Sequence, residues 1–176
     1  MKKIILAAVA IVGFTFTSNA QDDDTTRMQT AKGKWLIEAN TGNETLGNTG
    51  IYFSNQDGEY IYNVGFDGGY FIADDLAIKF GLGYGGDSET DLNGFSYRVG
   101  GKYYIASKFP ITLDVTGAKI DNQDENPLWL GIGGGYAWFI GDRISIEPGV
   151  RYNLSLNEDF SDKDRFQVNI GFVVYL

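Results

Sequence analysis

Eight charged residues have the types and spacing that could do chemistry, and they alternate with apolar residues along the chain. They are four acids and four bases: Glu38, Asp67, Asp114, Glu147, Lys79, Arg98, Lys102 and Arg151. Residues two apart lie on the same face of a β-strand, so a closed sheet would bring all eight into its interior. A charge in a confined space is costly unless an opposite charge pairs with it. We therefore predict a structural network of ion pairs, with a gated pore as the functional alternative.

The sequence offers little for catalysis or for a cofactor. It contains neither His nor Cys, so the commonest general base and the commonest transition-metal ligand are both missing. A nucleophilic Ser would therefore need an unusual base. We expect no enzyme, no catalytic residue, no metal site and no cofactor, and we keep an enzyme as an alternative.

Acidic residues gather in the segments between the predicted strands, and the whole chain carries a formal charge of −9. The densest group, Asp87-Ser88-Glu89-Thr90-Asp91, lacks the glycine and the distal Glu of a calcium-binding loop. We interpret it as a solvated loop tip. The negative charge also argues against a nucleic acid as partner, because phosphate binding requires a basic face.

The N-terminus predicts export. Lys2 and Lys3 precede an apolar run over residues 4–16, and small residues follow before a cut between Ala20 and Gln21. This is the pattern of a cleavable secretory signal peptide, and the run is shorter than the ~20 residues of a spanning helix. We predict a signal peptide over residues 1–20 and a flexible leader over residues 21–32.

Strict alternation of apolar and other residues begins after the leader and continues to the end of the chain, which is typical of β-strands. The clearest segment is 144–156, where Pro148 is the one residue that cannot donate to a ladder. We predict eight antiparallel strands, over residues 34–42, 59–72, 76–85, 94–106, 110–118, 128–140, 144–156 and 165–176. The links alternate between tight turns, at 73–75, 107–109 and 141–143, and long loops, at 43–58, 86–93, 119–127 and 157–164.

The apolar face of these strands is too bulky for the inside of an eight-stranded barrel, whose lumen barely holds ordinary side chains. The opposite face carries many glycines, namely Gly81, Gly83, Gly85, Gly131, Gly133 and Gly135. Near the tight turns it becomes bulky and predicts a plug made of Leu36, Phe71, Tyr104, Phe139 and Tyr175. We therefore expect the apolar face to look outward and the glycines, charges and plug to fill the interior.

Aromatic residues on the apolar face sort by height into two groups. One group lies toward the tight turns and the other toward the long loops: Trp35, Tyr70, Tyr103 and Trp138, and then Tyr60, Tyr62, Tyr97 and Tyr152. Two aromatic girdles around an aliphatic belt are what a bilayer selects. Residues 33–176 are therefore predicted to be an all-β, eight-stranded, antiparallel up-and-down transmembrane β-barrel. A soluble, lipocalin-like barrel that binds a ligand is the alternative fold.

Four segments, residues 69–78, 134–139, 144–152 and 167–176, resemble the small outer-membrane β-barrel family of OmpA-like and OmpX-like proteins. The resemblance implies a barrel in the outer membrane of a Gram-negative bacterium, with the leader in the periplasm. In that family the last strand ends in an aromatic residue that the barrel-assembly machinery reads. Here the corresponding signal would comprise Phe172, Tyr175 and Leu176, and the terminal residue departs from the pattern.

Together these observations predict a monomeric, closed barrel that contacts outer-membrane lipid and lipopolysaccharide. Its expected role is in envelope structure or in surface interaction through the acidic extracellular loops. A narrow, porin-like channel for small solutes is the alternative role.

Overall fold

The computed structural model describes residues 29–42 and 48–176. The predicted signal peptide and residues 21–28 of the predicted leader lie outside the described residues. The strands in the described part of the chain are β1 (Trp35–Asn40), β2 (Tyr52–Gln56), β3 (Glu59–Ala73), β4 (Leu76–Asp87), β5 (Leu92–Ile105), β6 (Phe109–Ile120), β7 (Leu128–Gly135), β8 (Trp138–Phe139), β9 (Ile144–Ser155) and β10 (Arg165–Tyr175).

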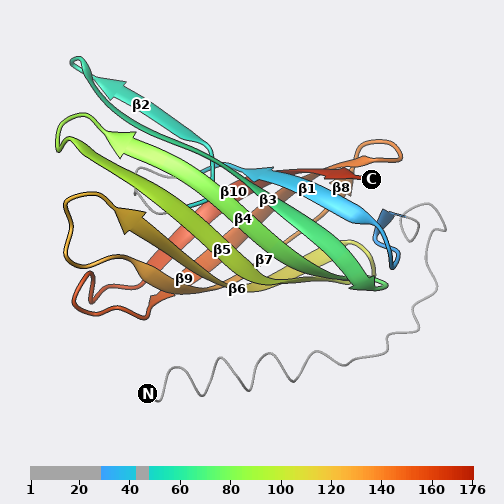
Figure 1. Cartoon of the computed structure of the whole chain (residues 1–176). Coiled ribbons are helices and arrows are strands. Elements are labelled where there is room, and N and C mark those ends of the chain that lie inside the picture. Colours follow the sequence, from blue (N-terminus) through green and yellow to red (C-terminus); the bar gives the residue numbers. More distant parts are fainter. Residues whose placement is uncertain (1–28, 43–47) are drawn as a thin grey trace.

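The strands form one closed, antiparallel barrel (Figure 1). Sequence neighbours pair from β3 to β7, β7 pairs with β9, and β9 pairs with β10. β1 closes the barrel because it pairs with β10 on one side and with β3 on the other. β7 and β8 pair with β9 one after the other and together count as one strand of the barrel, and β2 extends the sheet only beside the start of β3. The barrel therefore has eight strands around its circumference, and the predicted fold class is confirmed.

The predicted loop at residues 43–58 is partly wrong, because β2 occupies residues 52–56 and pairs with the start of β3. The two strands meet at Asp57-Gly58, whose φ angles of 54° and 95° suit a two-residue hairpin. Asp-Gly is a strong sequence signal for such a turn. The β2–β3 hairpin projects beyond the neighbouring strands at the end of the barrel that carries the long loops (Figure 1). We call this end the loop end and the opposite one the turn end.

The gap between β7 and β8 is a local effect of Pro148. The backbone N–H of Tyr136 donates to the Pro148 carbonyl (3.1 Å), but Pro148 has no N–H to return. The register nevertheless continues unchanged, from Gly135↔Gly149 to Trp138↔Ile146. Pro148 therefore weakens one pair of the ladder without shifting the strand.

The barrel has an apolar outside and a polar inside. The outward residues of β10 show this most clearly, since Phe166 and Val168 are 66% and 74% exposed. Most inward residues of the other strands are buried, and many of them are polar or charged. No helix among the described residues is long and apolar enough to cross a membrane.

The described end of the predicted leader, residues 29–32, is held against the turn end. The Thr30 hydroxyl donates to the Asp75 carboxylate (2.5 Å), and the Lys32 N–H donates to the Asp74 carboxylate (2.9 Å). The Gln29 amide donates to the Gly141 carbonyl (3.1 Å), which lies in another turn. These four residues therefore pack on the turn end of the barrel.

Candidate functional site

All eight predicted charged residues lie inside the barrel, and none is more than 9% exposed. β1, β3, β4 and β6 each contribute one, and β5 and β9 contribute two each. The period of two along each strand turns all of them inward. We call these eight side chains the lumen charge network.

The half of this network nearer the turn end is centred on Lys102. Its ammonium donates to one oxygen of Glu38 (2.8 Å) and to one of Glu147 (2.5 Å). Lys79 donates to the same Glu38 oxygen (2.7 Å) and lies 3.1 Å from an Asp67 oxygen. Each lysine therefore bridges two carboxylates. Lys102 on β5 reaches across the lumen to β1 and β9, whereas Lys79 on β4 joins the neighbouring strands β3 and β1.

The other half of the network contains the two arginines. Arg98 donates to Asp67 (2.6 Å) through its Nη1 and to the Thr116 hydroxyl (3.1 Å) through its Nε. Arg151 donates from both terminal nitrogens to the two oxygens of Asp114, at 2.6 and 2.5 Å. A fork of this kind is the strongest ion-pair geometry that side chains offer. Since Arg98 also lies 3.5 Å from Asp114, the eight charges form one continuous, balanced chain.

Inward glycines make room for these side chains. A Cβ atom at Gly131 would collide with the Arg151 guanidinium, and one at Gly100 would collide with Asp114. A Cβ at Gly81 would collide with the Asp67 carboxylate. Gly81 and Gly100 stand directly beside Asp67 and Asp114 of the neighbouring strands, and Gly131 lies next to β9, so these glycines make room for charged side chains of adjacent strands.

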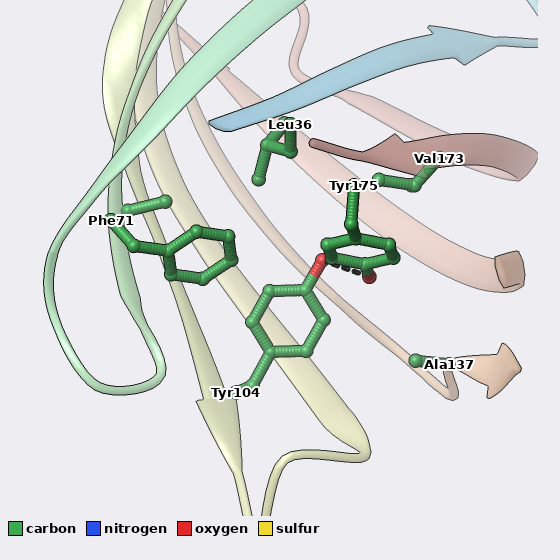
Figure 2. Close-up of a cluster of buried hydrophobic side chains, with 7 residues drawn as sticks. Leu36, Phe71, Tyr104, Ala137, Val173 and Tyr175 are labelled. Carbon is green, nitrogen blue, oxygen red and sulfur yellow. Dashed lines mark hydrogen bonds between the residues drawn. The ribbon is translucent and has the colours of Figure 1, made fainter. Parts of the chain in front are cut away.

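An apolar cluster closes the turn end beneath the network (Figure 2). Its members are Leu36, Phe71, Ala77, Tyr104, Ala137, Val173 and Tyr175, with Phe139 packed against them. All five residues of the predicted plug belong to this set. The hydroxyl groups of Tyr104 and Tyr175 lie 3.0 Å apart, and both reach Glu147 at 3.0 Å. The plug is therefore tied to the charge network by hydrogen bonds as well as by packing.

Residues 48–50 enter the lumen at the loop end, which the sequence analysis missed. The Asn48 carbonyl accepts hydrogen bonds from Asn63 (3.0 Å) and Ser96 (2.6 Å), and Thr49 is 1% exposed. A Cβ atom at Gly65 would lie only 2.6–2.8 Å from the Thr49 backbone. The available signal was the set of inward glycines on β3 and β4, which leave space that the backbone of Asn48 and Thr49 and the Thr49 side chain fill.

A small polar cavity of about 90 Å³ remains between the lumen charge network and the segment that contains Asn48 and Gly50. Its lining includes Asn40, Asn48, Arg98, Asp114, Arg151 and Asn169. A cavity of this size and polarity suits a few water molecules, since one water needs roughly 10–15 Å³. Among the described residues, no group of three or more acidic side chains is arranged to hold a metal ion.

Several acids of the predicted loops stabilise their own backbone. Asp87 accepts a hydrogen bond from the Glu89 N–H (2.9 Å), and Asp164 accepts one from the Ser155 N–H (3.0 Å). Tyr152 also donates to Asp164 (3.2 Å). These acids therefore stabilise the conformation of their loops through hydrogen bonds, which requires no bound ion.

The predicted aromatic girdle residues all lie on the outer face. Trp35 and Tyr70 are in contact near the turn end, with ring centroids 4.9 Å apart, and Tyr60 and Tyr62 are neighbours near the loop end, at 6.3 Å. Most are well exposed, whereas Tyr62 and Tyr103 are half-buried. The exposed members are Trp35, Tyr60, Tyr70, Tyr97, Trp138 and Tyr152.

The three residues of the predicted C-terminal signal divide between the two faces. Phe172 and Leu176 point outward and are 50% and 55% exposed. Tyr175 points inward and belongs to the plug. The terminal strand therefore presents Phe172 and Leu176, but not Tyr175, on its outer side.

Solved structures with a similar fold include the N-terminal β-barrel domain of Pseudomonas aeruginosa OprF. It aligns with a TM-score of 0.51 and 16% identity, over 82% of this chain and 98% of that one. Yersinia pestis outer membrane protein Ail aligns with a TM-score of 0.48 and 10% identity, over 82% of this chain and 100% of that one. Outer membrane protein AlkL aligns with a TM-score of 0.42 and 12% identity, over 93% of this chain and 94% of that one. No protein-family model and no curated protein matches the chain. The resemblance seen in the sequence is thus confirmed at the level of the fold.

Proposed function

We propose that this protein is an integral barrel of the outer membrane, with a closed lumen and a role in envelope structure or surface interaction. The observation that carries the proposal is the inverted distribution of side chains. Large apolar residues cover the outside, while paired charges fill the inside. A soluble barrel that binds an apolar ligand would require the opposite arrangement.

The outer surface of the barrel determines which solvent can surround it. Soluble monomers rarely expose a continuous apolar surface larger than a few hundred Å², whereas here the outer face is apolar around the barrel. A closed barrel can enter hydrocarbon because every strand edge within it is paired. The aromatic residues near both ends suit the two membrane–water interfaces. The outer-membrane barrels among the similar solved structures agree with this location.

The closed lumen favours a structural role over a channel. The apolar plug fills the turn end, and residues 48–50 occupy part of the loop end. Every charge between them has a partner at 3.5 Å or less. A narrow channel remains the second candidate, because a polar cavity does lie between the two closures. We propose no enzymatic activity, since the acidic and basic side chains of the interior form ion pairs with one another and are therefore not available to a substrate.

The loop end is the side that would meet a partner. The β2–β3 hairpin extends there, and Phe53 on its outer side is 70% exposed. Asp57, Glu59 and Asp87 give the same region a negative charge. We propose that this end faces the cell exterior and that the turn end faces the periplasm. Export behind the signal peptide and recognition of the last strand by the assembly machinery complete the proposal.

Labelling of intact cells tests the location and the orientation. The chain contains no Cys, so a single introduced Cys is a unique site for a membrane-impermeant maleimide. We expect Asn55→Cys, beside the hairpin turn, to react on intact cells. Asp142→Cys, in the turn between β8 and β9, is the matched control and should react only after the outer membrane is permeabilised. Labelling of Asp142→Cys alone on intact cells, or recovery of the protein in the soluble fraction, would contradict the proposal.

A further inference from the structure

The outer face of the barrel has a notch at Gly101. Outward positions on β5 alternate with inward ones, so Gly101 stands between Val99 and Tyr103 on the apolar side. Its neighbours across the sheet are Ile78 on β4 and Leu113 on β6. A Cβ atom at Gly101 would have the Ala77 carbonyl oxygen at 3.7 Å as its one near contact. The missing side chain therefore leaves a gap in an otherwise continuous apolar belt.

This gap is part of a groove of about 400 Å³. Its walls include Ile72, Leu76, Ile78, Leu113, Val115 and Leu130. Leu130 points outward but is only 6% exposed, whereas outward residues of β10 are 38–74% exposed. Leu113 and Val115 are half-buried in the same way. The side chains here pack against one another around the groove instead of projecting from the sheet. The volume of the groove falls in the range of small-molecule sites, roughly 300–1,000 Å³.

The position of the groove indicates which part of a lipid would fill it. It extends along β5 from Val99 to Tyr103 and along β6 from Ile111 to Val115. Four residues of strand span roughly 13 Å, and because the strands of a barrel tilt by about 40° from its axis, this length corresponds to roughly 10 Å of depth in an ~30 Å hydrocarbon core. The groove thus lies within one leaflet, on the side of the turn end.

A cation lies in the turn beyond that end of the groove, while the acids of the neighbouring β3–β4 turn, Asp74 and Asp75, accept hydrogen bonds from residues 32 and 30. Lys108 belongs to the turn that joins β5 to β6, is half-buried and makes no ion pair with any residue that the structure describes. An apolar groove with an unpaired cation beyond its end matches a molecule with an acyl chain and an anionic head. We propose that this groove binds one glycerophospholipid of the periplasmic leaflet, with its acyl chain over Gly101 and its phosphate near Lys108. This inference rests on the proposed membrane location and orientation.

Other occupants fit the groove less well. Lipopolysaccharide belongs to the opposite leaflet under the proposed orientation, where the loop end carries Asp87, Asp121 and Asp164. A second copy of the chain in the same orientation would offer Lys108 the acids of its own turn end, but Asp74 and Asp75 there already accept hydrogen bonds from residues 32 and 30. The phospholipid satisfies both the apolar walls and the charge.

The test compares two outward glycines. Gly101→Leu fills the groove, and Gly68→Leu is the matched control, since Gly68 also faces outward and a Cβ there meets nothing within 4 Å. Each protein is refolded into vesicles of phosphatidylglycerol and phosphatidylethanolamine, shown to float with them, extracted in mild detergent and examined by native mass spectrometry. We expect wild type and Gly68→Leu to retain one phospholipid and Gly101→Leu to retain about tenfold less, a factor that corresponds to ~1.4 kcal/mol. Lys108→Gln, in the turn between β5 and β6, should reduce retention of phosphatidylglycerol and serves if Gly101→Leu does not fold.

The outcomes separate the two proposals. Equal retention by Gly101→Leu, Lys108→Gln and wild type would mean an adventitious lipid only and would overturn the groove proposal, as would a dimer that Gly101→Leu abolishes. Wild-type protein that floats with vesicles but retains no phospholipid would also overturn it, while leaving the membrane location intact. Protein that never floats would instead contradict the proposed function.

Discussion

Replacing Lys102 by Met is expected to lower the free energy of unfolding by ~3–5 kcal/mol, because it removes one partner of a buried set of charges. Lys102 is 1% exposed and bridges Glu38 and Glu147. Without it, Glu147 loses its only ammonium partner among the described residues and keeps just the hydroxyl groups of Tyr104, Ser145 and Tyr175. The measurement is urea unfolding of the vesicle-inserted protein, followed by tryptophan fluorescence.

Two further variants make this result specific to the network. Lys163→Met removes an exposed loop lysine and should change the free energy by no more than about 0.5 kcal/mol, as is usual for surface positions. Adding Glu147→Gln to Lys102→Met removes the stranded charge and should recover part of the loss. Equal costs for Lys102→Met and Lys163→Met would show that the interior charges do not stabilise the barrel.

Ile170→Arg is expected to cost ~2–4 kcal/mol when the protein folds into a bilayer, because it places a charge at the middle of the lipid-facing belt. Ile170 stands halfway along β10, points outward and is 41% exposed. Phe166→Arg is the matched control on the same strand and face, but at the loop end, where the cost should fall to about 0–1 kcal/mol.

The comparison of these two variants reports the depth of each position in lipid. The measurement is the unfolding free energy of each variant in vesicles of the same composition. In a barrel surrounded by water both positions are exposed, so the two substitutions would cost the same amount. Equal costs would therefore contradict the membrane-facing assignment of β10.

Most of the fold could be predicted because the alternating pattern is long and the turn signals are local. Strands β3, β5, β6 and β9 lie within about two residues of their predicted limits. The break after Gly135 required knowing that Tyr136 pairs with Pro148, and this pairing depends on the register between strands. The sequence shows the proline but not which residue of the next strand lacks its donor.

The first loop was predicted less well, for two different reasons. β2 was overlooked although Asp57-Gly58 is a recognisable hairpin turn, so the signal was present in the sequence. The entry of residues 48–50 into the lumen was not predictable in the same way. It depends on three-dimensional space left by Gly65 and Gly83 on two neighbouring strands, and on Asn63 and Ser96 as donors from β3 and β5.

The members of the lumen charge network could be named from the sequence, but their partners could not. Their inward orientation follows from the alternation of side chains along a strand, because every second residue points to the same face. Pairing depends on the height of each residue in the barrel, which the register of all the strands sets together. Arg151 thus reaches Asp114 on β6 across β7, past Gly131, rather than Glu147 four residues earlier on its own strand.

Single-channel recording in planar bilayers tests most directly the claim that this barrel is closed. Insertion of the refolded protein is first verified by the reaction of Asn55→Cys with maleimide from one side. A closed lumen predicts no steady conductance above the bilayer background for wild type, and none for Arg98→Ala, whose effect should fall on stability instead. Steady, ion-selective current steps in wild type that change with Arg98→Ala would contradict it and would establish the lumen as a channel.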